Sequence, residues 1–294
     1  MTQKLLFSLA GLFGASLALQ GQIIFSQASD DMYVINNGSF TQATGVFTRT
    51  AADTGIDVGQ GIAVSFDQFS LNTVGHSIQT QFTLSGITQN NSGYQIALGL
   101  FSGAAVTQNA DTAVTDGWTG YFQSIGTRSS SGDVNGGVFR QGEGSQPLMA
   151  RTLGWGSNDG AVDGAAGRLG SGIRPPLNQN VSQTVTMTLT RISDTQLQLS
   201  TVYTTPRLDA TRTDTAGGIP FTWSAASGVG TMVSTYTLGD GVPTTISGFA
   251  FGTTTSNFTI QNLEVTAIPE PSTYAAILGL LGLAFVAWRR RARR

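Results

Sequence analysis

The sequence contains no cysteine, and this absence excludes several kinds of stabilisation and chemistry at once. No disulfide, cysteine-ligated zinc site or iron–sulfur cluster can form, and no thiol nucleophile is available. The fold must therefore be held by core burial, aided at most by bound Ca²⁺. A chain of 294 residues is long enough to bury such a core.

Histidine is almost as scarce, because His76 is the single one. Zinc sites built on histidine need three of them or a Cys/His mixture, so the count excludes these sites. A Ser-His-Asp triad needs its histidine within hydrogen-bond reach of both partners, and nothing around His76 indicates that arrangement. We expect His76 to be a surface or turn residue at the entry to a strand.

Charge is also sparse, since only 11% of residues are charged and the one lysine is Lys4. The chain has 15 Lys+Arg and 17 Asp+Glu, and residues 22–268 keep nine of the former, all arginine, and 16 of the latter. This region thus carries a net charge near −7. Binding to nucleic acid needs clustered cations, so we expect no nucleic-acid partner.

The N-terminus has the pattern of a secretory signal peptide over residues 1–21. Lys4 begins a short positive region, an apolar stretch follows to Leu19, and small residues occur at Ser16 and Ala18. We expect cleavage after Ala18 or Gly21. The alternative is an N-terminal anchor that is not cleaved.

The C-terminus, residues 269–294, has three parts. Pro269-Glu270-Pro271 is followed by 15 uncharged residues, 274–288, and then by a basic tail, 289–294. A helix of that length spans about 22 Å against a hydrocarbon core of about 30 Å, a gap that bilayer thinning and snorkelling can close. The basic residues are Arg289, Arg290, Arg291, Arg293 and Arg294.

Moving these five arginines across a membrane would cost on the order of 15 kcal/mol, so we expect them to stay in the cytoplasm. A single transmembrane helix over 274–288 would then leave the preceding domain outside. The alternative is a buried core helix, which rarely ends in a run of arginines.

Residues 269–294 resemble the PEP-CTERM sorting signal of Gram-negative bacteria. The resemblance implies an exosortase-type membrane protease as a partner, with cleavage near Pro269-Glu270-Pro271. It also implies a protein tethered to the inner membrane and facing the periplasm, and then passed to the cell surface or to an exopolysaccharide matrix, as in biofilms.

Between the two ends, residues 22–268 read as one domain of short strands. Apolar and polar residues alternate over 78–84, 183–189 and 195–203, and the last two runs are joined by a short turn at 192–195. Further strands are expected at Ile62–Phe69, Tyr94–Phe101, Gly120–Ile125, Gly248–Gly252 and Phe258–Val265.

These runs predict an all-β fold, a jelly-roll-like antiparallel β-sandwich. Their order resembles a concanavalin/laminin-G-like sandwich, in which the last strand pairs back near the first. Residues 126–172 differ, because 13 of 47 are glycine. There we expect ordered loops with strand pieces at Val138–Arg140 and Leu148–Leu153, and a second loop over Thr204–Phe221.

Catalytic residues are not evident. A glycoside hydrolase needs two carboxylates facing one groove, and residues 22–268 hold only two glutamates, Glu143 and Glu264. Glu264 is expected to face solvent from the last strand. A distant aspartate could complete a pair with Glu143, so a hydrolase is the less favoured alternative.

Oxygen ligands for Ca²⁺ could come from Asp159 and Asp163 in the loop 158–164. The loop lacks the EF-hand spacing, and aspartate beside glycine also forms ordinary turns. Apart from this Ca²⁺ site we expect no cofactor.

Sugar rings stack on flat aromatic faces, and four aromatic residues are expected in or beside loops: Trp118, Tyr121, Trp155 and Trp223. The alternative is that they pack in the core or under loops. The sequence favours a structural or adhesive envelope or matrix protein that is not an enzyme. The alternative is a non-catalytic carbohydrate-binding module.

Overall fold

The computed structural model describes most of the region between the two termini and five residues of the C-terminal tail. The described residues are 21–35, 40–43, 46–49, 60–86, 95–107, 118–126, 135–140, 167–168, 182–204, 212–214, 221–224, 229–238, 243–253, 258–268, 279, 282, 288, 289 and 291. The predicted signal peptide, residues 1–21, lies outside them except for Gly21.

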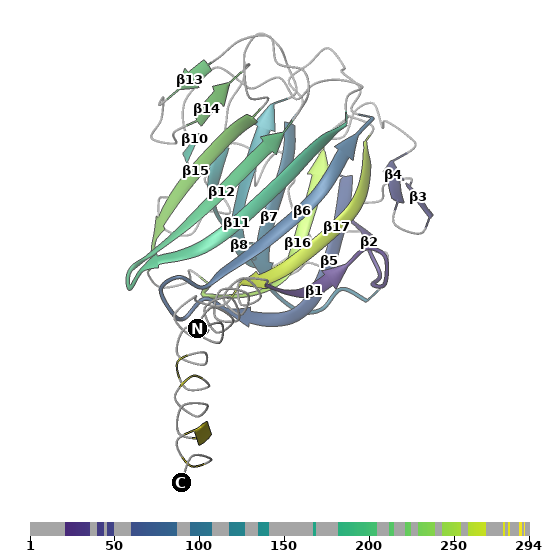
Figure 1. Cartoon of the computed structure of the whole chain (residues 1–294). Helices are drawn as coiled ribbons and strands as arrows, with labels where there is room; N and C mark the ends of the chain where they lie inside the picture. The colour runs from purple at the N-terminus through teal and green to yellow at the C-terminus, as the bar shows by residue number, and fades with distance from the viewer. Residues whose placement is uncertain are drawn as a thin grey trace, which may run out of the picture.

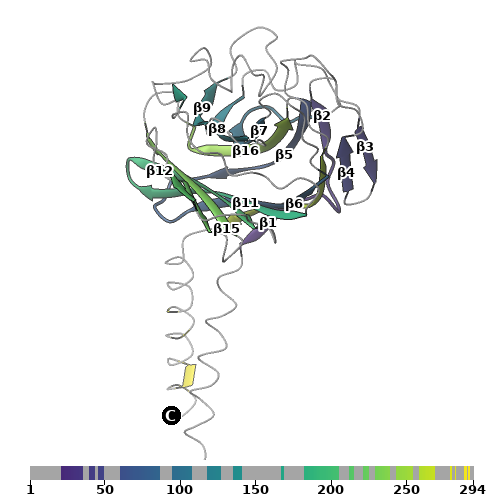
Figure 2. The same ribbon diagram turned by 90° about the horizontal axis from the view of Figure 1, so that it is seen from above.

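The fold is an antiparallel β-sandwich of two packed sheets (Figures 1 and 2). Sheet A has the order β13 (Arg212–Asp214), β14 (Phe221–Ser224), β15 (Val229–Thr237), β12 (Gln196–Thr204), β11 (Gln183–Ser193), β6 (Ser77–Ser85), β17 (Thr259–Ile268), β4 (Val46–Arg49) and β3 (Phe40–Ala43), with β1 (Gln22–Ser26) also on β17. Sheet B has the order β10 (Gly167–Arg168), β9 (Asn135–Arg140), β8 (Thr119–Gly126), β7 (Gln95–Ser102), β16 (Thr245–Thr253), β5 (Gln60–Ser70) and β2 (Tyr33–Ile35).

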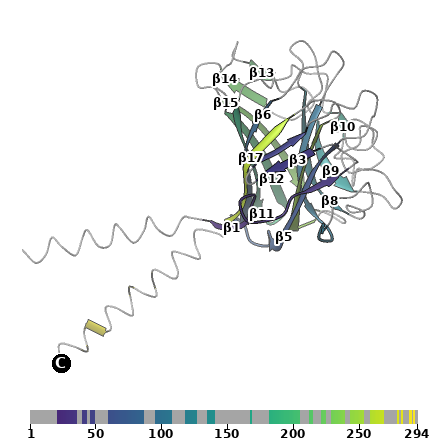
Figure 3. The same ribbon diagram turned by 90° about the vertical axis from the view of Figure 1, so that its right-hand side faces the viewer.

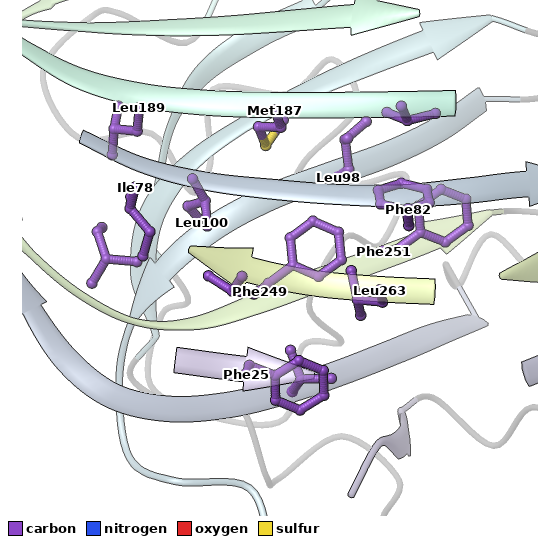
Figure 4. Close-up of a cluster of buried hydrophobic side chains, with 14 of the residues drawn as sticks. Phe25, Ile78, Phe82, Leu98, Leu100, Met187, Leu189, Phe249, Phe251 and Leu263 are labelled. Carbon is purple, nitrogen blue, oxygen red and sulfur yellow. The ribbon is translucent and has the colours of Figure 1, made fainter. Parts of the chain in front are cut away.

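Alternation of apolar and polar side chains explains why the two sheets face each other. Along β11 and β12 the side chains alternate between buried and half-buried, because successive residues of a strand point to opposite faces. Val185, Met187 and Leu189 point inward, and threonines occupy the outer face of β11. Phe82 meets Phe249 and Phe251 of sheet B with ring centroids 5.8 and 5.6 Å apart (Figure 4).

The structure confirms the predicted all-β class. The described residues between 21 and 268 form strands and no helix. The hairpin of β11 and β12 turns at Asp194-Thr195 as expected, and the last strand pairs with the first. The expected loop over Thr204–Phe221 is corrected, because β13 lies inside it. The expected piece at Leu148–Leu153 lies outside the described residues.

The first and last strands bring the two ends of the domain together. In the ladder between β1 and β17, Gln22 is opposite Ala267, and β17 continues for one residue to Ile268. Ser77 lies beside Ile268 on one side and Thr190 on the other. We call this end of the sandwich the terminal pole: residues 21–23, the turn 71–76, residues 191–195 and residues 266–268. Figure 3 shows β1 at a corner of the sandwich.

A buried glutamine joins β1 to an irregular point of β17. The register of β17 against β6 shifts between Gln261 and Glu264, and Asn262 there has a φ of 55°. Gln27 fills the break: its Oε1 accepts from the Leu263 N–H at 2.9 Å and its Nε2 donates to the Ile260 carbonyl at 3.3 Å. Its own N–H donates to the Leu263 carbonyl at 2.8 Å. One side chain thus replaces ladder bonds that the bulge removes.

Replacing Gln27 with leucine should destabilise the domain by about 1–3 kcal/mol, because the buried Leu263 N–H and Ile260 carbonyl would lose their partners. Urea unfolding measures the change. Gln81→Leu is the matched control, since Gln81 is exposed on β6, and it should change stability by less than about 0.5 kcal/mol. Equal effects of the two substitutions would contradict this role for Gln27.

Candidate functional site

Trp118 is buried on the outer face of sheet B, where loop residues cover it. Its side chain is 1% exposed, and its Nε1 donates to the Ala104 carbonyl at 3.0 Å. Its ring lies 5.7 Å from the ring of Phe101, centroid to centroid. Residues 103–107, which follow β7, cover this face, and we call them the strap. Gly103 exchanges hydrogen bonds with Ser247 Oγ, and the Val106 N–H donates to Ser65 Oγ at 2.7 Å.

Glycines make room for these rings. A Cβ on Gly248 would lie 2.7 Å from Cη2 of Trp118, and one on Gly99 would lie 2.6 Å from Cζ of Phe101. Side chains therefore cannot replace the hydrogens at these positions without displacing a ring. The outer face of sheet B carries a small second core, which the sequence did not predict.

Tyr121 is also buried, on the inner face of sheet B. It is 0% exposed, belongs to the main core and donates its hydroxyl proton to the Pro243 carbonyl at 2.6 Å. The hypothesis that Trp118 and Tyr121 offer ring faces to a glycan is therefore wrong, because a buried ring has no free face for a sugar. Of the other two candidates, Trp155 lies outside the described residues, and the backbone of Trp223 pairs with Arg212 and Gly230.

Of the carboxylates predicted as candidates for catalysis or metal binding, Glu264 is the one among the described residues. Glu264 is exposed on β17, as expected, opposite Gln81 of β6. Glu143, Asp159 and Asp163 lie outside the described residues. Among the described residues, no group of three or more His, Asp or Glu side chains could hold a metal ion.

His76 occupies a turn, as expected. Its side chain is half-buried, with Nδ1 3.2 Å from the Ser70 carbonyl oxygen and the ring 5.9 Å from that of Phe69. Both contacts are with the end of β5, the strand that leads into this turn.

Buried polar side chains between the sheets include Gln123, Thr201, Tyr203 and Gln183. Gln123 of β8 donates to the Leu199 carbonyl at 3.3 Å and accepts a hydrogen bond from the Thr201 hydroxyl. The Tyr203 hydroxyl and both polar atoms of the Gln183 side chain have no hydrogen-bond partner in the structure.

Burial raises the pKa of Tyr203 well above its ordinary value, and the nearby Thr201 hydroxyl lowers the pKa by less. The hydrogen bond that Thr201 donates goes to Gln123, and the Tyr203 hydroxyl has no hydrogen-bond partner. Such groups in a core lower stability.

Five residues of the C-terminal segment 269–294 are described, and all are helical and exposed: Gly279, Gly282, Trp288, Arg289 and Arg291. Among the described residues, none of the helices reaches the length and apolar character that crossing a membrane requires. Pro269, Glu270 and Pro271 and the remaining arginines, Arg290, Arg293 and Arg294, lie outside the described residues.

The C-terminus matches a known sorting signal: residues 267–294 match the family model of the PEP-CTERM protein-sorting motif. The match begins with Ala267 and Ile268, the last two residues of β17. No curated protein matches the sequence.

Solved structures similar to this chain are lectin-like β-sandwiches with low sequence identity. The Emp46p carbohydrate recognition domain in its potassium-bound form is 9% identical, with 84% of this chain and 96% of that chain covered and a TM-score of 0.43. Lectin II from Ulex europaeus is 8% identical, with coverages of 84% and 96% and a TM-score of 0.44. Lectin I-B4 from Griffonia simplicifolia is 9% identical, with coverages of 83% and 96% and a TM-score of 0.44.

Gly248→Ala should destabilise the domain by about 1–3 kcal/mol, because the new methyl group would force Trp118 out of its place. Urea unfolding followed by tryptophan emission measures the effect. Gly282→Ala is the control, since nothing lies within 4 Å of a Cβ there. An unchanged unfolding midpoint for Gly248→Ala would show that Trp118 is not held against β16.

Tyr203→Phe should leave the domain as stable as the native protein, or make it more stable, at about pH 8, because it removes a buried hydroxyl that lacks a partner. A pKa raised in the folded state favours the neutral phenol, so stability is present below the unfolded pKa of about 10 and is lost as pH rises beyond it.

The loss of unfolding free energy between about pH 8 and about pH 11 should therefore be smaller in Tyr203→Phe. Tyr33→Phe is the control, because Tyr33 lies near the surface, and it should keep most of the alkaline loss. A Tyr203→Phe variant with the full alkaline loss would contradict the prediction.

Proposed function

We propose that the chain is an exported β-sandwich protein of the cell envelope or exopolysaccharide matrix, with a structural or adhesive role and no catalysis. A signal peptide over residues 1–21 directs its export. A transmembrane helix over 274–288 then tethers residues 22–268 to the inner membrane, on the periplasmic side. An exosortase-type membrane protease acts near Pro269-Glu270-Pro271 and passes the domain to the surface or matrix.

The observation that carries this proposal is the PEP-CTERM match over residues 267–294, which begins in the last two residues of the last strand. β17 ends at Ile268, and Pro269 follows at once. Proline has no N–H to donate to a sheet ladder, so it suits the point where the folded domain stops. Removal of residues beyond the motif would leave every described strand of the sandwich whole.

The basic residues Arg289, Arg290, Arg291, Arg293 and Arg294 have a defined role in this proposal. They hold the end of the helix in the cytoplasm, because the cost of moving them through the bilayer exceeds what a 15-residue apolar helix can offset. Exposed Arg289 and Arg291 beside Trp288 fit the headgroup region, where tryptophan and arginine side chains reach polar surroundings.

A structural role agrees better with the described side chains than an enzymatic one does. Glu264 stands exposed on a regular strand, and His76 contacts the end of β5. Two of the four aromatic rings considered for sugar contact are packed inside. These packed rings favour a structural role over a carbohydrate-binding module.

Replacing Pro269, Glu270 and Pro271 together with alanine should keep the protein in the membrane fraction of a host that makes an exosortase. The native protein should move to the surface and the medium without its basic tail. Fractionation with an antibody to the sandwich measures the distribution, and mass spectrometry of the released C-terminus identifies the cut.

Glu264→Gln is the matched control, because it removes a nearby exposed carboxylate without touching the motif, and it should be released normally. Release of the triple alanine variant at the native rate, or a released protein that still ends in Arg294, would contradict the proposal.

A further inference from the structure

Three large apolar side chains are exposed at the terminal pole, on segments that β17 and β6 separate. Among the described residues outside the tail they are Ile23, Val74 and Ile192, with 54%, 39% and 38% of their surface exposed. Val74 and Ile192 belong to neighbouring segments, because the Gly75 N–H donates to the Arg191 carbonyl at 2.8 Å and the Arg191 N–H to the His76 carbonyl at 2.9 Å.

Ile23 reaches the same end from β1. It is opposite Thr266, two residues before β17 ends at Ile268. Figure 1 shows β1 along the lower end of β17. Farther from the pole the outer face of sheet A is polar, with Gln79, Gln81 and Thr83 on β6 and Thr184, Thr186 and Thr188 on β11.

The length of the chain beyond β17 determines what can approach this pole. Five residues, 269–273, separate Ile268 from the start of the apolar segment at Tyr274. An extended chain spans at most about 3.6 Å per residue, so these residues reach no more than about 18 Å. A membrane helix that begins at Tyr274 therefore holds the terminal pole close to the lipid headgroups.

Hydrogen bonds from Arg191 hold two segments of the terminal pole together. Arg191 donates from Nε to the Ser193 carbonyl at 2.6 Å, from Nη2 to the Asp194 carbonyl at 2.5 Å and from Nη1 to the Leu71 carbonyl at 3.3 Å. One guanidinium thus ties the hairpin that carries Ile192 to the turn that carries Val74. Asp194 is exposed beside Ile192, so its charge limits the depth to which this surface can enter a bilayer.

From these observations we propose that the terminal pole is a membrane-contacting surface, whose partner is the headgroup layer of the bilayer that anchors the chain. Ile23, Val74 and Ile192 lie against the lipid and orient the sandwich, and the opposite ends of β6 and β12 point away from the membrane. The inference rests on the proposed C-terminal anchor and adds an orientation to it. The tether keeps the terminal pole at the bilayer surface, so apolar contacts that are weak by themselves can orient the domain.

The absence of cysteine makes a direct test possible, because a single introduced cysteine is the only labelling site. The full chain is reconstituted into phosphatidylcholine–phosphatidylglycerol vesicles that contain lipid spin-labelled on the headgroup, or on the acyl chain for the Gly282→Cys variant. An environment-sensitive fluorophore is attached in turn to Ile23→Cys, Val74→Cys and Ile192→Cys. Control positions are Gln81→Cys on the same sheet and Thr204→Cys at the far end of β12, both exposed.

We expect the spin label to quench the three pole positions several-fold more strongly than Gln81→Cys and Thr204→Cys. Gly282→Cys reports on the anchor itself, since it lies in the apolar segment. If lipid quenches the label at Gly282→Cys while the pole and control positions behave alike, the membrane-contacting surface is refuted and the anchor stands. If lipid does not quench the label at Gly282→Cys, the anchor fails, and the orientation fails with it.

A second set of variants guards against misfolding of the labelled proteins. Ile23, Val74 and Ile192 are replaced together by threonine, which suits the exposed strand positions of Ile23 and Ile192 and has nearly the shape of Val74. The fluorophore is placed at Thr73→Cys in the exposed turn. Circular dichroism confirms that the sandwich remains. The threonine variant should lose at least half of the lipid quenching seen with Thr73→Cys alone, and unchanged quenching would overturn the proposal.

Discussion

The pairing of β17 with both β1 and β6 is the constraint on which the arrangement of this protein depends. β17 is the last strand before the sorting signal, β1 is the first strand after the predicted signal peptide, and β6 continues the sheet. Because the three strands are antiparallel neighbours, the end of the domain and its beginning leave from the same place. The predicted signal peptide and the sorting motif are therefore joined to the domain at the same end, the terminal pole.

The ladder is regular at its ends and irregular in its middle, and the irregular part depends on a single buried side chain. The bulge at Asn262 interrupts the hydrogen bonds between β17 and β6, and Gln27 supplies both a donor and an acceptor in their place. These hydrogen bonds contribute to stability because the groups are buried. A buried donor or acceptor that loses its partner cannot bond to water instead. The first strand is therefore required for the last strand to keep its shape.

Several long strands could be predicted from sequence because each carries its own evidence, whereas β15, with nine residues, was not predicted. The alternation in β6, β11 and β12 is local, and a period of two can come only from a half-buried strand. The short strands β2, β3, β4 and β13 were not predicted, since three or four residues are too few to show a period. Gln27 acts on residues 233 and 236 positions away, a relation that no local pattern contains.

The fate of the aromatic residues follows from the same limit. Trp118 and Tyr121 stand beside loops in the sequence, where an exposed ring is a reasonable expectation, but the strap after β7 covers one and the opposite sheet covers the other. Gly248 and Gly99 leave space for the rings of Trp118 and Phe101, and this role can be recognised only when β7, β8 and β16 are known to be neighbours. Local pattern thus decided which segments are strands, and the packing of distant strands decided which side chains remain free to meet a partner.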